Sequence, residues 1–383
     1  MGNVLRPETE AELASMIASS RGPFELAGTA TKRGLGRPVE AEARLDLSGF
    51  SGIHLYEPDE LVLEAGAGTL LAEIEKTVAA ANQQLAFEPP DLSRLYGSSH
   101  AGTVGGLVAC NLAGPRRIKV GAARDHVLGF TGVSGRGEIF KAGARVVKNV
   151  TGYDLPKLLT GSYGTLAALT SVTLKVLPKP ETEETLVISG LDDAGAVRAM
   201  SLAMQSSCEV SGAAHVPGKG TFLRLEGIAP SIAYRRDKLR ALLQGTIAIL
   251  DAAQSERQWL AIGDVTALAD TSERIVWRIS VAPSEAPAVL ARIKSKVEAR
   301  YFLDWAGGLI WLDVPPAEDA CEPLIRGAIT AGHAMLVRAP AALRSRLAVF
   351  QPQPQALAAV SARVKASFDP QGRLNPGRMY RMT

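Results

Sequence analysis

Three glycine-rich segments in the first half of the chain limit its possible folds more than any other feature. They are residues 28–37 (GTATKRGLGR), 97–111 (GSSHAGTVGGLVACN) and 159–176 (LTGSYGTLAALTSVTLKV). A backbone without Cβ atoms reaches positive φ values and lets successive N–H groups approach one anion. The first segment alone fits an ordinary tight connection after a strand equally well. Three such loops in one region favour an anion-binding domain.

The order of expected elements predicts two α+β domains in a chain of 383 residues. Residues 1–178 alternate short apolar runs with glycine loops, and we expect helices over 69–82 and from Val104, and a hairpin turning at 135–137. After a charged linker, residues 179–355 run strand, helix, strand, strand, helix, which is typical of an extended ferredoxin-like fold. A final helix is expected after the QPQPQ loop, and we find no internal repeat.

Charge and composition exclude several classes of function. Basic residues exceed acidic ones by three (42 against 39) and form no dense tract, so nucleic acid is not an expected partner. The cysteines and the five histidines are scattered, so we expect neither an iron-sulfur cluster nor a metal site. No long apolar run and no apolar leader occur, so we expect a cytoplasmic chain without a transmembrane segment.

The segment AGAGTLLAEIEK, residues 65–76, imitates the GxGxxG pattern of nicotinamide-binding Rossmann folds. Leu71 occupies the third glycine position, where a side chain hinders close packing of helix and strand. We therefore interpret this segment as a glycine turn capped by Thr69, not as a dinucleotide site.

Five motifs, taken in order, resemble a known family. They are GTATKRGLGR, EPPDLSRLYGSSHAGTVGG, NLAGPRRIKVGAARD, VVKNVTGYDLPKLLTGSYGTLAALTSVTLKV and FDPQGRLNPGRM. Together they are similar to the PCMH-type flavoproteins of the vanillyl-alcohol oxidase type, and among these to the FAD-binding E subunits of glycolate oxidases. The resemblance covers the first 180 residues and the last 20 closely. It implies a PCMH-type FAD-binding domain over 1–178, a cap domain over 179–355, and a C-terminal segment, 356–383, that returns to the FAD domain.

The resemblance also implies a set of FAD-contacting residues. Those expected at the diphosphate and ribityl chain are Gly28, Thr29, Ala30, Thr31, Pro90, Asp91, Gly102, Thr103, Gly105 and Gly106. Those expected beside or near the flavin are Gly121, Arg124, Asp125, Gly161, Thr165, Leu166 and Asn375. For Arg124 and Asp125, a structural ion pair is the alternative. A threonine stands where covalent relatives have a flavin-linking histidine, so the FAD is expected to be non-covalent.

Catalytic residues are less clearly indicated. Relatives that oxidise 2-hydroxy acids by themselves carry an HGHxGDGN motif, whereas this sequence offers only His333 in AITAGHAMLVRAP. His333 is a candidate base for the hydroxyl proton, and Arg116 and Arg117 are candidates for holding a carboxylate. A structural histidine and solvated surface arginines are the alternatives.

The resemblance implies an FAD-binding subunit of a glycolate (2-hydroxy acid) dehydrogenase or oxidase complex. Its expected partners are a sister FAD catalytic subunit, which oxidises the substrate, and an iron-sulfur subunit that takes electrons onward. The location implied is cytoplasmic, including a peripheral position at the inner face of the membrane held by those partners. Two alternatives stay open: a free-standing FAD-dependent 2-hydroxy-acid dehydrogenase, and a non-catalytic assembly subunit with structural FAD.

Overall fold

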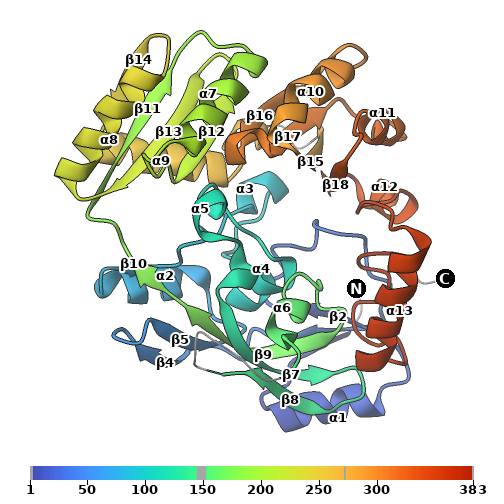
Figure 1. Cartoon of the computed structure of the whole chain (residues 1–383). Helices are drawn as coiled ribbons and strands as arrows, with labels where there is room; N and C mark the ends of the chain where they lie inside the picture. Colours follow the sequence, from blue (N-terminus) through green and yellow to red (C-terminus); the bar gives the residue numbers. More distant parts are fainter. Residues whose placement is uncertain (1–2, 145–151, 271–272, 382–383) are drawn as a thin grey trace.

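The computed structural model describes residues 3–144, 152–270 and 273–381, so part of the motif VVKNVTGYD lies outside the described residues. Figure 1 shows two lobes, one above the other. We call the described residues of 3–178 and 355–381 the first lobe, and those of 182–346 the second lobe.

Two main sheets form the first lobe. A parallel sheet has the order β1-β3-β2, with β1 (Asn3–Leu5), β2 (Phe24–Ala27) and β3 (Ala43–Asp46). An antiparallel sheet has the order β4-β5-β9-β7-β8, with β4 (Ile53–Glu57), β5 (Val62–Gly66), β7 (Val127–Ser134), β8 (Ile139–Gly143) and β9 (Ala167–Lys175). The pairing of β7 with β8 confirms the expected hairpin. β9 is buried on both faces, and its buried residues include the polar Thr170, Ser171 and Thr173.

Short helices cover these sheets. They are α1 (Glu10–Ser19), α2 (Leu71–Ala80), α3 (Ser93–Tyr96), α4 (Val104–Cys110), α5 (Arg117–Val120) and α6 (Leu155–Leu159), and β6 (Gln83–Gln84) pairs with β10 (Leu177–Pro178). The predicted helices at α2 and α4 are confirmed. Thr69 closes the glycine turn, as expected, because its hydroxyl donates to Gly66 O at 2.7 Å, and Leu70 is the N-cap of α2.

The second lobe is built on one eight-stranded antiparallel sheet, in the order β14-β11-β13-β12-β16-β17-β15-β18. Its strands are β11 (Thr182–Ile188), β12 (Gly212–Val216), β13 (Gly220–Gly227), β14 (Ile247–Leu250), β15 (Ile275–Val281), β16 (Arg300–Asp304), β17 (Leu309–Val314) and β18 (Gly332–Arg338). Its helices are α7 (Asp193–Gln205), α8 (Ala229–Leu242), α9 (Ala252–Gly263), α10 (Ala286–Lys294), α11 (Glu322–Gly327) and α12 (Ala341–Arg346).

Two βαββαβ units stand side by side in this sheet. Strands β11 to β14, and again β15 to β18, follow the spatial order 4-1-3-2 of a ferredoxin-like fold. The units meet where β12 pairs with β16 at His215 and Leu303. The expected extended ferredoxin-like architecture is confirmed, although the sequence had shown no repeat. Because β11 starts at Thr182, the charged linker is shorter than the segment PKPETEE suggests.

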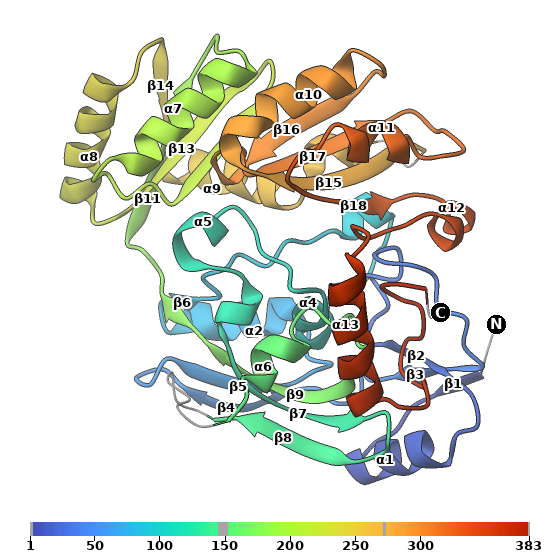
Figure 2. The same ribbon diagram turned by 45° about the vertical axis from the view of Figure 1, so that its right-hand side comes forward.

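The two faces of the large sheet have different neighbours. Helices α7, α8, α10 and α11 lie on the face turned away from the first lobe (Figure 2). The other face joins an apolar cluster that includes Phe302, Trp311 and Val337 from the second lobe and Leu35 and Leu95 from the first. The lobes are therefore packed together through a shared apolar layer.

Four charged side chains meet at the same interface: two buried arginines and two partly buried glutamates. Arg224 of β13 donates to both carboxylate oxygens of Glu88 in the first lobe, at 2.6 and 3.0 Å. In the reverse direction, Arg116 of the first lobe pairs with Glu226 of β13. Burial acts to raise the pKa of Glu88, but Arg224 and Arg116 outweigh it and hold that pKa below its ordinary value. The cluster has no net charge, which is the condition for burying ions.

The chain ends on the first lobe. Helix α13 (Gln355–Phe368) runs down beside it in Figure 1, and Lys365 donates to Thr165 O at 2.6 Å. The last described residues then contact β2, where Phe24 N donates to Arg373 O at 2.7 Å and Asn375 N to Phe24 O at 3.0 Å. Residues at the two ends of the sequence thus share one wall of the first lobe.

Candidate functional site

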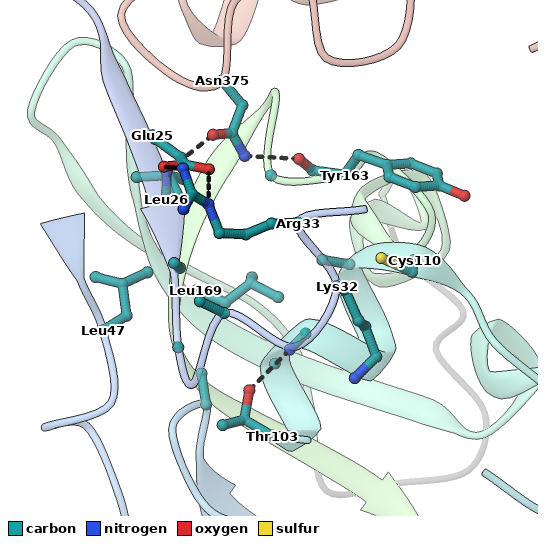
Figure 3. Close-up of a pocket in the computed structure, with 18 of the residues that line it drawn as sticks. Glu25, Leu26, Lys32, Arg33, Leu47, Thr103, Cys110, Tyr163, Leu169 and Asn375 are labelled. Atoms are coloured by element: carbon teal, nitrogen blue, oxygen red, sulfur yellow. Dashed lines mark hydrogen bonds and ion pairs between the residues drawn. The ribbon is translucent and has the colours of Figure 1, made fainter. Parts of the chain in front are cut away.

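A cavity of about 120 Å³ lies in the first lobe between the end of β2, helix α4 and the C-terminal segment (Figure 3). Residues 28–33 form one side, α4 with Cys110 the second, and residues 162–164 with Asn375 the third. The three glycine segments of the sequence therefore meet at one place, as an anion-binding domain requires.

Bare backbone is needed on two sides of this cavity. A Cβ atom on Gly28 would lie 2.8 Å from the Thr103 hydroxyl oxygen, and one on Gly105 would lie 2.7 Å from Ala67 O. Thr103 itself caps α4, because its hydroxyl accepts from Gly106 N at 3.2 Å. The glycines let α4 approach β2 and β5 closely enough to leave only a narrow, backbone-lined pocket.

Lys32 brings a cation to the same cavity. Its ammonium lies beside Gly102, since a Cβ there would be 2.7 Å from Nζ, and the one hydrogen bond that it donates within the described residues is a long 3.5 Å contact to the Thr31 hydroxyl. Burial lowers the pKa of Lys32, while the charges of Cys110 and Asp91 act in the opposite direction. A cation and bare backbone around one pocket suit a diphosphate. The residues present therefore fit FAD, and Lys32, which the sequence analysis did not select, belongs with the predicted loop.

Asn375 joins the walls of the cavity to one another. Its side-chain oxygen accepts from Leu26 N at 2.8 Å, and its amide donates to Tyr163 O at 2.8 Å (Figure 3). It sits at a positive φ of 43°. Gly164 approaches it so closely that a Cβ would lie 2.7 Å from the Asn375 amide nitrogen. Asn375 thus acts as a clamp on the pocket.

The remaining predicted cofactor residues are divided between the cavity and its surroundings. Those that line it are Gly28, Thr29, Ala30, Thr31, Thr103, Gly105, Gly106 and Asn375. Those that lie outside its lining are Pro90, Asp91, Gly102, Gly121, Arg124, Asp125, Gly161, Thr165 and Leu166.

Three of the outer residues have other partners. Asp91 N donates to Asp264 Oδ1 of the second lobe at 2.8 Å. The Asp125 carboxylate accepts from Ala122 N at 2.9 Å, so it closes its own turn, and Arg124 N donates to the Asn111 side chain at 3.0 Å.

A second, smaller cavity of about 50 Å³ adjoins the first at the interface of the lobes. Cys110 and Tyr163 line both cavities. The smaller one reaches the second lobe at Arg278, Asp304 and Trp311. Burial raises the pKa of Asp304 to about 7. The sequence analysis named none of these second-lobe residues.

The three catalytic candidates do not converge on one atom. Arg116 is buried and paired with Glu226. Arg117 lies with its guanidinium 4.2 Å from the centre of the Trp305 ring. His333 has an exposed side chain at the start of β18, and partial desolvation of its imidazole, followed by the charges of Arg278 and Arg117, lowers its pKa.

Two absences hold for the part of the chain that the structure describes. It contains no group of three or more His, Cys, Asp or Glu side chains able to hold a metal ion. None of its helices is both long enough and apolar enough to cross a membrane.

Comparison with known proteins agrees with this geometry. The family described as "FAD binding domain" matches residues 2–143. D-lactate dehydrogenase of Anaerostipes hadrus is 38% identical over 144 residues, which cover 38% of this chain and 29% of that protein. In fold, 4-ethylphenol oxidase from Gulosibacter chungangensis matches with a TM-score of 0.71 at 14% identity, covering 99% of this chain and 89% of that one.

One similarity extends over the whole length. Glycolate oxidase subunit GlcE of Escherichia coli K12 is 33% identical over 375 residues, covering 96% of each chain. Both lobes of the present structure are included in that match, so the second lobe as well as the FAD-binding region is shared. The chain belongs to the GlcE family of FAD-binding flavoprotein oxidoreductases.

Proposed function

We propose that this chain is the FAD-binding subunit of a glycolate, or related 2-hydroxy acid, oxidase complex and that it supports electron transfer from a sister catalytic flavoprotein. The observation that carries the proposal is the contrast in coverage: the match to a protein named as a subunit spans 96% of the chain, whereas the match to a dehydrogenase spans 38%. The second lobe is what this chain shares with the subunit.

The residues of the chain have defined parts in this role. Lys32 and the backbone of residues 28–31 neutralise and orient the diphosphate, and Asn375 keeps the surrounding loops in place. FAD, when bound, supplies the two-electron acceptor. Thr29 and Thr31 offer hydroxyls and no imidazole at the loop, which supports a non-covalent cofactor.

The complex that we propose has three kinds of subunit. The sister FAD subunit oxidises the 2-hydroxy acid, this chain accepts the electrons, and an iron-sulfur subunit takes them onward. The assembly lies in the cytoplasm or peripherally at the inner face of the membrane. Purification of the native complex through a tag on this chain tests the composition: iron and a second flavoprotein should elute in fixed ratio to it.

The division of labour is tested by anaerobic mixing with millimolar glycolate or D-lactate. The isolated holoprotein should keep its yellow colour, and addition of the sister flavoprotein should bleach it. Rapid bleaching of the lone chain, abolished by His333→Ala, would instead establish a free-standing dehydrogenase. Full turnover by a complex whose present chain contains no flavin would establish an assembly subunit.

A further inference from the structure

Arg278 stands out on the sheet face that is turned toward the first lobe. Val276 on the same strand, Trp311 on β17 and Met335 on β18 are its apolar neighbours there, and the last two are paired with Arg278 in register. Ser280, the next residue of the strand IVWRISV on that face, is polar, and both Arg278 and Ser280 are half-buried. A cation in that position needs a physical reason.

No carboxylate compensates this charge. Among the residues that the structure describes, the Arg278 side chain makes no hydrogen bond or ion pair, and its guanidinium lies 4.9 Å from the centre of the Trp305 ring and 6.0 Å from that of the Trp311 ring. Asp304 is near enough to act on it electrostatically but does not pair with it. Burial, followed by repulsion from Arg117, lowers the pKa of Arg278 to about 10. Stacking on indole offsets only part of such a desolvation cost.

The buried arginines Arg224 and Arg344 have acceptors within the protein. Arg224 binds both oxygens of Glu88, and Arg344 donates to Gly36 O at 2.6 Å. Both therefore have an evident structural function. Arg278 differs from them, because its side chain opens into a cavity and not onto an acceptor of the protein.

The small cavity has the size and the position of a ligand site. Its volume of about 50 Å³ admits a few water-sized groups, enough for a compact organic acid. Its polar lining consists of Arg278, Asp304, Asn111 and the Tyr163 hydroxyl, which donates to the Met335 sulfur at 3.8 Å. Through Cys110 and Tyr163 it continues into the cofactor cavity. Arg117, which is exposed, adds positive charge outside it.

We propose that Arg278 holds the carboxylate of a small monocarboxylic acid in this cavity, at the end of the FAD site. The guanidinium offers two parallel N–H donors to a carboxylate, and Trp305 and Trp311 fix its plane. The site goes beyond the proposed function, because electron transfer from a sister subunit needs no carboxylate site in this chain.

The test is titration calorimetry of the anaerobic holoprotein with glycolate and with glycolamide, its uncharged analogue of the same size. Glycolate should bind saturably and glycolamide at least tenfold more weakly. Arg278→Gln should weaken glycolate binding about tenfold to a hundredfold, since it removes a charge-assisted pair. Arg278→Lys, which keeps the charge but not the planar fork, should fall between them. Arg257→Gln, at an exposed arginine of α9, is the matched control and should bind as the parent does.

Folding of each variant is checked by circular dichroism and thermal melting, and Arg278→Gln should melt no lower than the parent because an uncompensated cation is lost. The proposal is overturned if the folded parent holoprotein binds no glycolate, or if it binds glycolamide as tightly as glycolate. It is also overturned if both Arg278→Gln and Arg278→Lys bind glycolate as tightly as the parent does. If glycolate does not bind but the sister flavoprotein still bleaches this chain, the proposed function stands and this inference falls. If glycolate binds but the sister flavoprotein does not bleach the chain, this inference stands alone.

Discussion

The buried charge cluster between the lobes predicts a large loss of stability on Glu88→Gln. Glu88 accepts two hydrogen bonds from Arg224 and one from Arg116 N at 2.6 Å. The substitution turns one acceptor into an amide that faces a guanidinium, and it leaves the cluster with a net positive charge. Removing one partner of a buried pair typically costs about 3–5 kcal/mol. Because the Glu88 side chain is 25% exposed, we expect a loss of about 3 kcal/mol, at the lower end of that range.

Differential scanning calorimetry at pH 7.5 measures this loss. For a lobe of this size, about 3 kcal/mol corresponds to a Tm lower by roughly 6–12 °C. The matched control is Glu209→Gln, whose side chain is 67% exposed and whose nearest cations are 3.8 and 3.9 Å away. That pairing should be worth less than about 0.5 kcal/mol. A Tm for Glu88→Gln no lower than that of the control would refute the reasoning.

The stability that Glu88 contributes should depend on pH in a definite direction. Because its pKa is held below the ordinary value of 4.5, the Glu88 carboxylate contributes stability that is complete above pH 4.5 and is lost as the pH falls through the lowered value. The difference in Tm between parent and Glu88→Gln should therefore be largest at neutral pH and shrink below pH 4.5. A difference that stays constant down to pH 3 would contradict an ionic origin.

Four further predictions concern the two cavities and the cofactor. Lys32→Met should weaken FAD binding about tenfold to a hundredfold in fluorescence titration of the apoprotein, through loss of a charged partner, and Lys76→Met on the exposed side of α2 should not. Acid precipitation should release the yellow cofactor into the supernatant, whereas colour in the pellet would show a covalent link. Asn375→Ala should weaken FAD binding in the same titration, because Leu26 N and Tyr163 O lose their partner; unchanged affinity in a folded variant would contradict the clamp. Since burial raises the pKa of Asp304 to about 7, its contribution to stability is complete below its ordinary value of 3.8 and is lost as the pH rises toward 7, so Asp304→Asn should raise Tm at pH 8 and leave it unchanged near pH 3.5.

Local chemistry explains which parts of the fold could be predicted from the sequence. Thr103 followed by an apolar run predicts the start of α4, and glycines at 135–137 predict the β7–β8 hairpin, because each signal is confined to a few residues. The doubling of the ferredoxin-like unit was missed. The two units share only an order of strands and helices, and such an order leaves no residue-by-residue repeat to detect.

The candidate site was only partly predictable for a similar reason. The glycine loops were identifiable because their conformation demands glycine. Lys32 and Arg278 are single cations, and what distinguishes them is the absence of a carboxylate in three dimensions. One signal for Arg278 was nevertheless present, since it is the one charged residue in the strand IVWRISV and occupies an inward position.

The second lobe consists of two half-sheets that are joined at a single residue pair between β12 and β16. Each half-sheet contacts the first lobe through a different kind of interaction. The half-sheet of β11 to β14 contacts the first lobe through ion pairs of Arg224 and Glu226. The half-sheet of β15 to β18 contacts the first lobe through hydrogen bonds to main-chain carbonyls, such as Trp305 to Gly114 O at 3.1 Å and Tyr96 to Val337 O at 3.0 Å. Protonation of Glu88 in acid therefore weakens the contact between the half-sheet of β11 to β14 and the first lobe. The contact of the half-sheet of β15 to β18, which carries Arg278, is unaffected. Amide hydrogen exchange at low pH should accelerate in β13 before it does in β15.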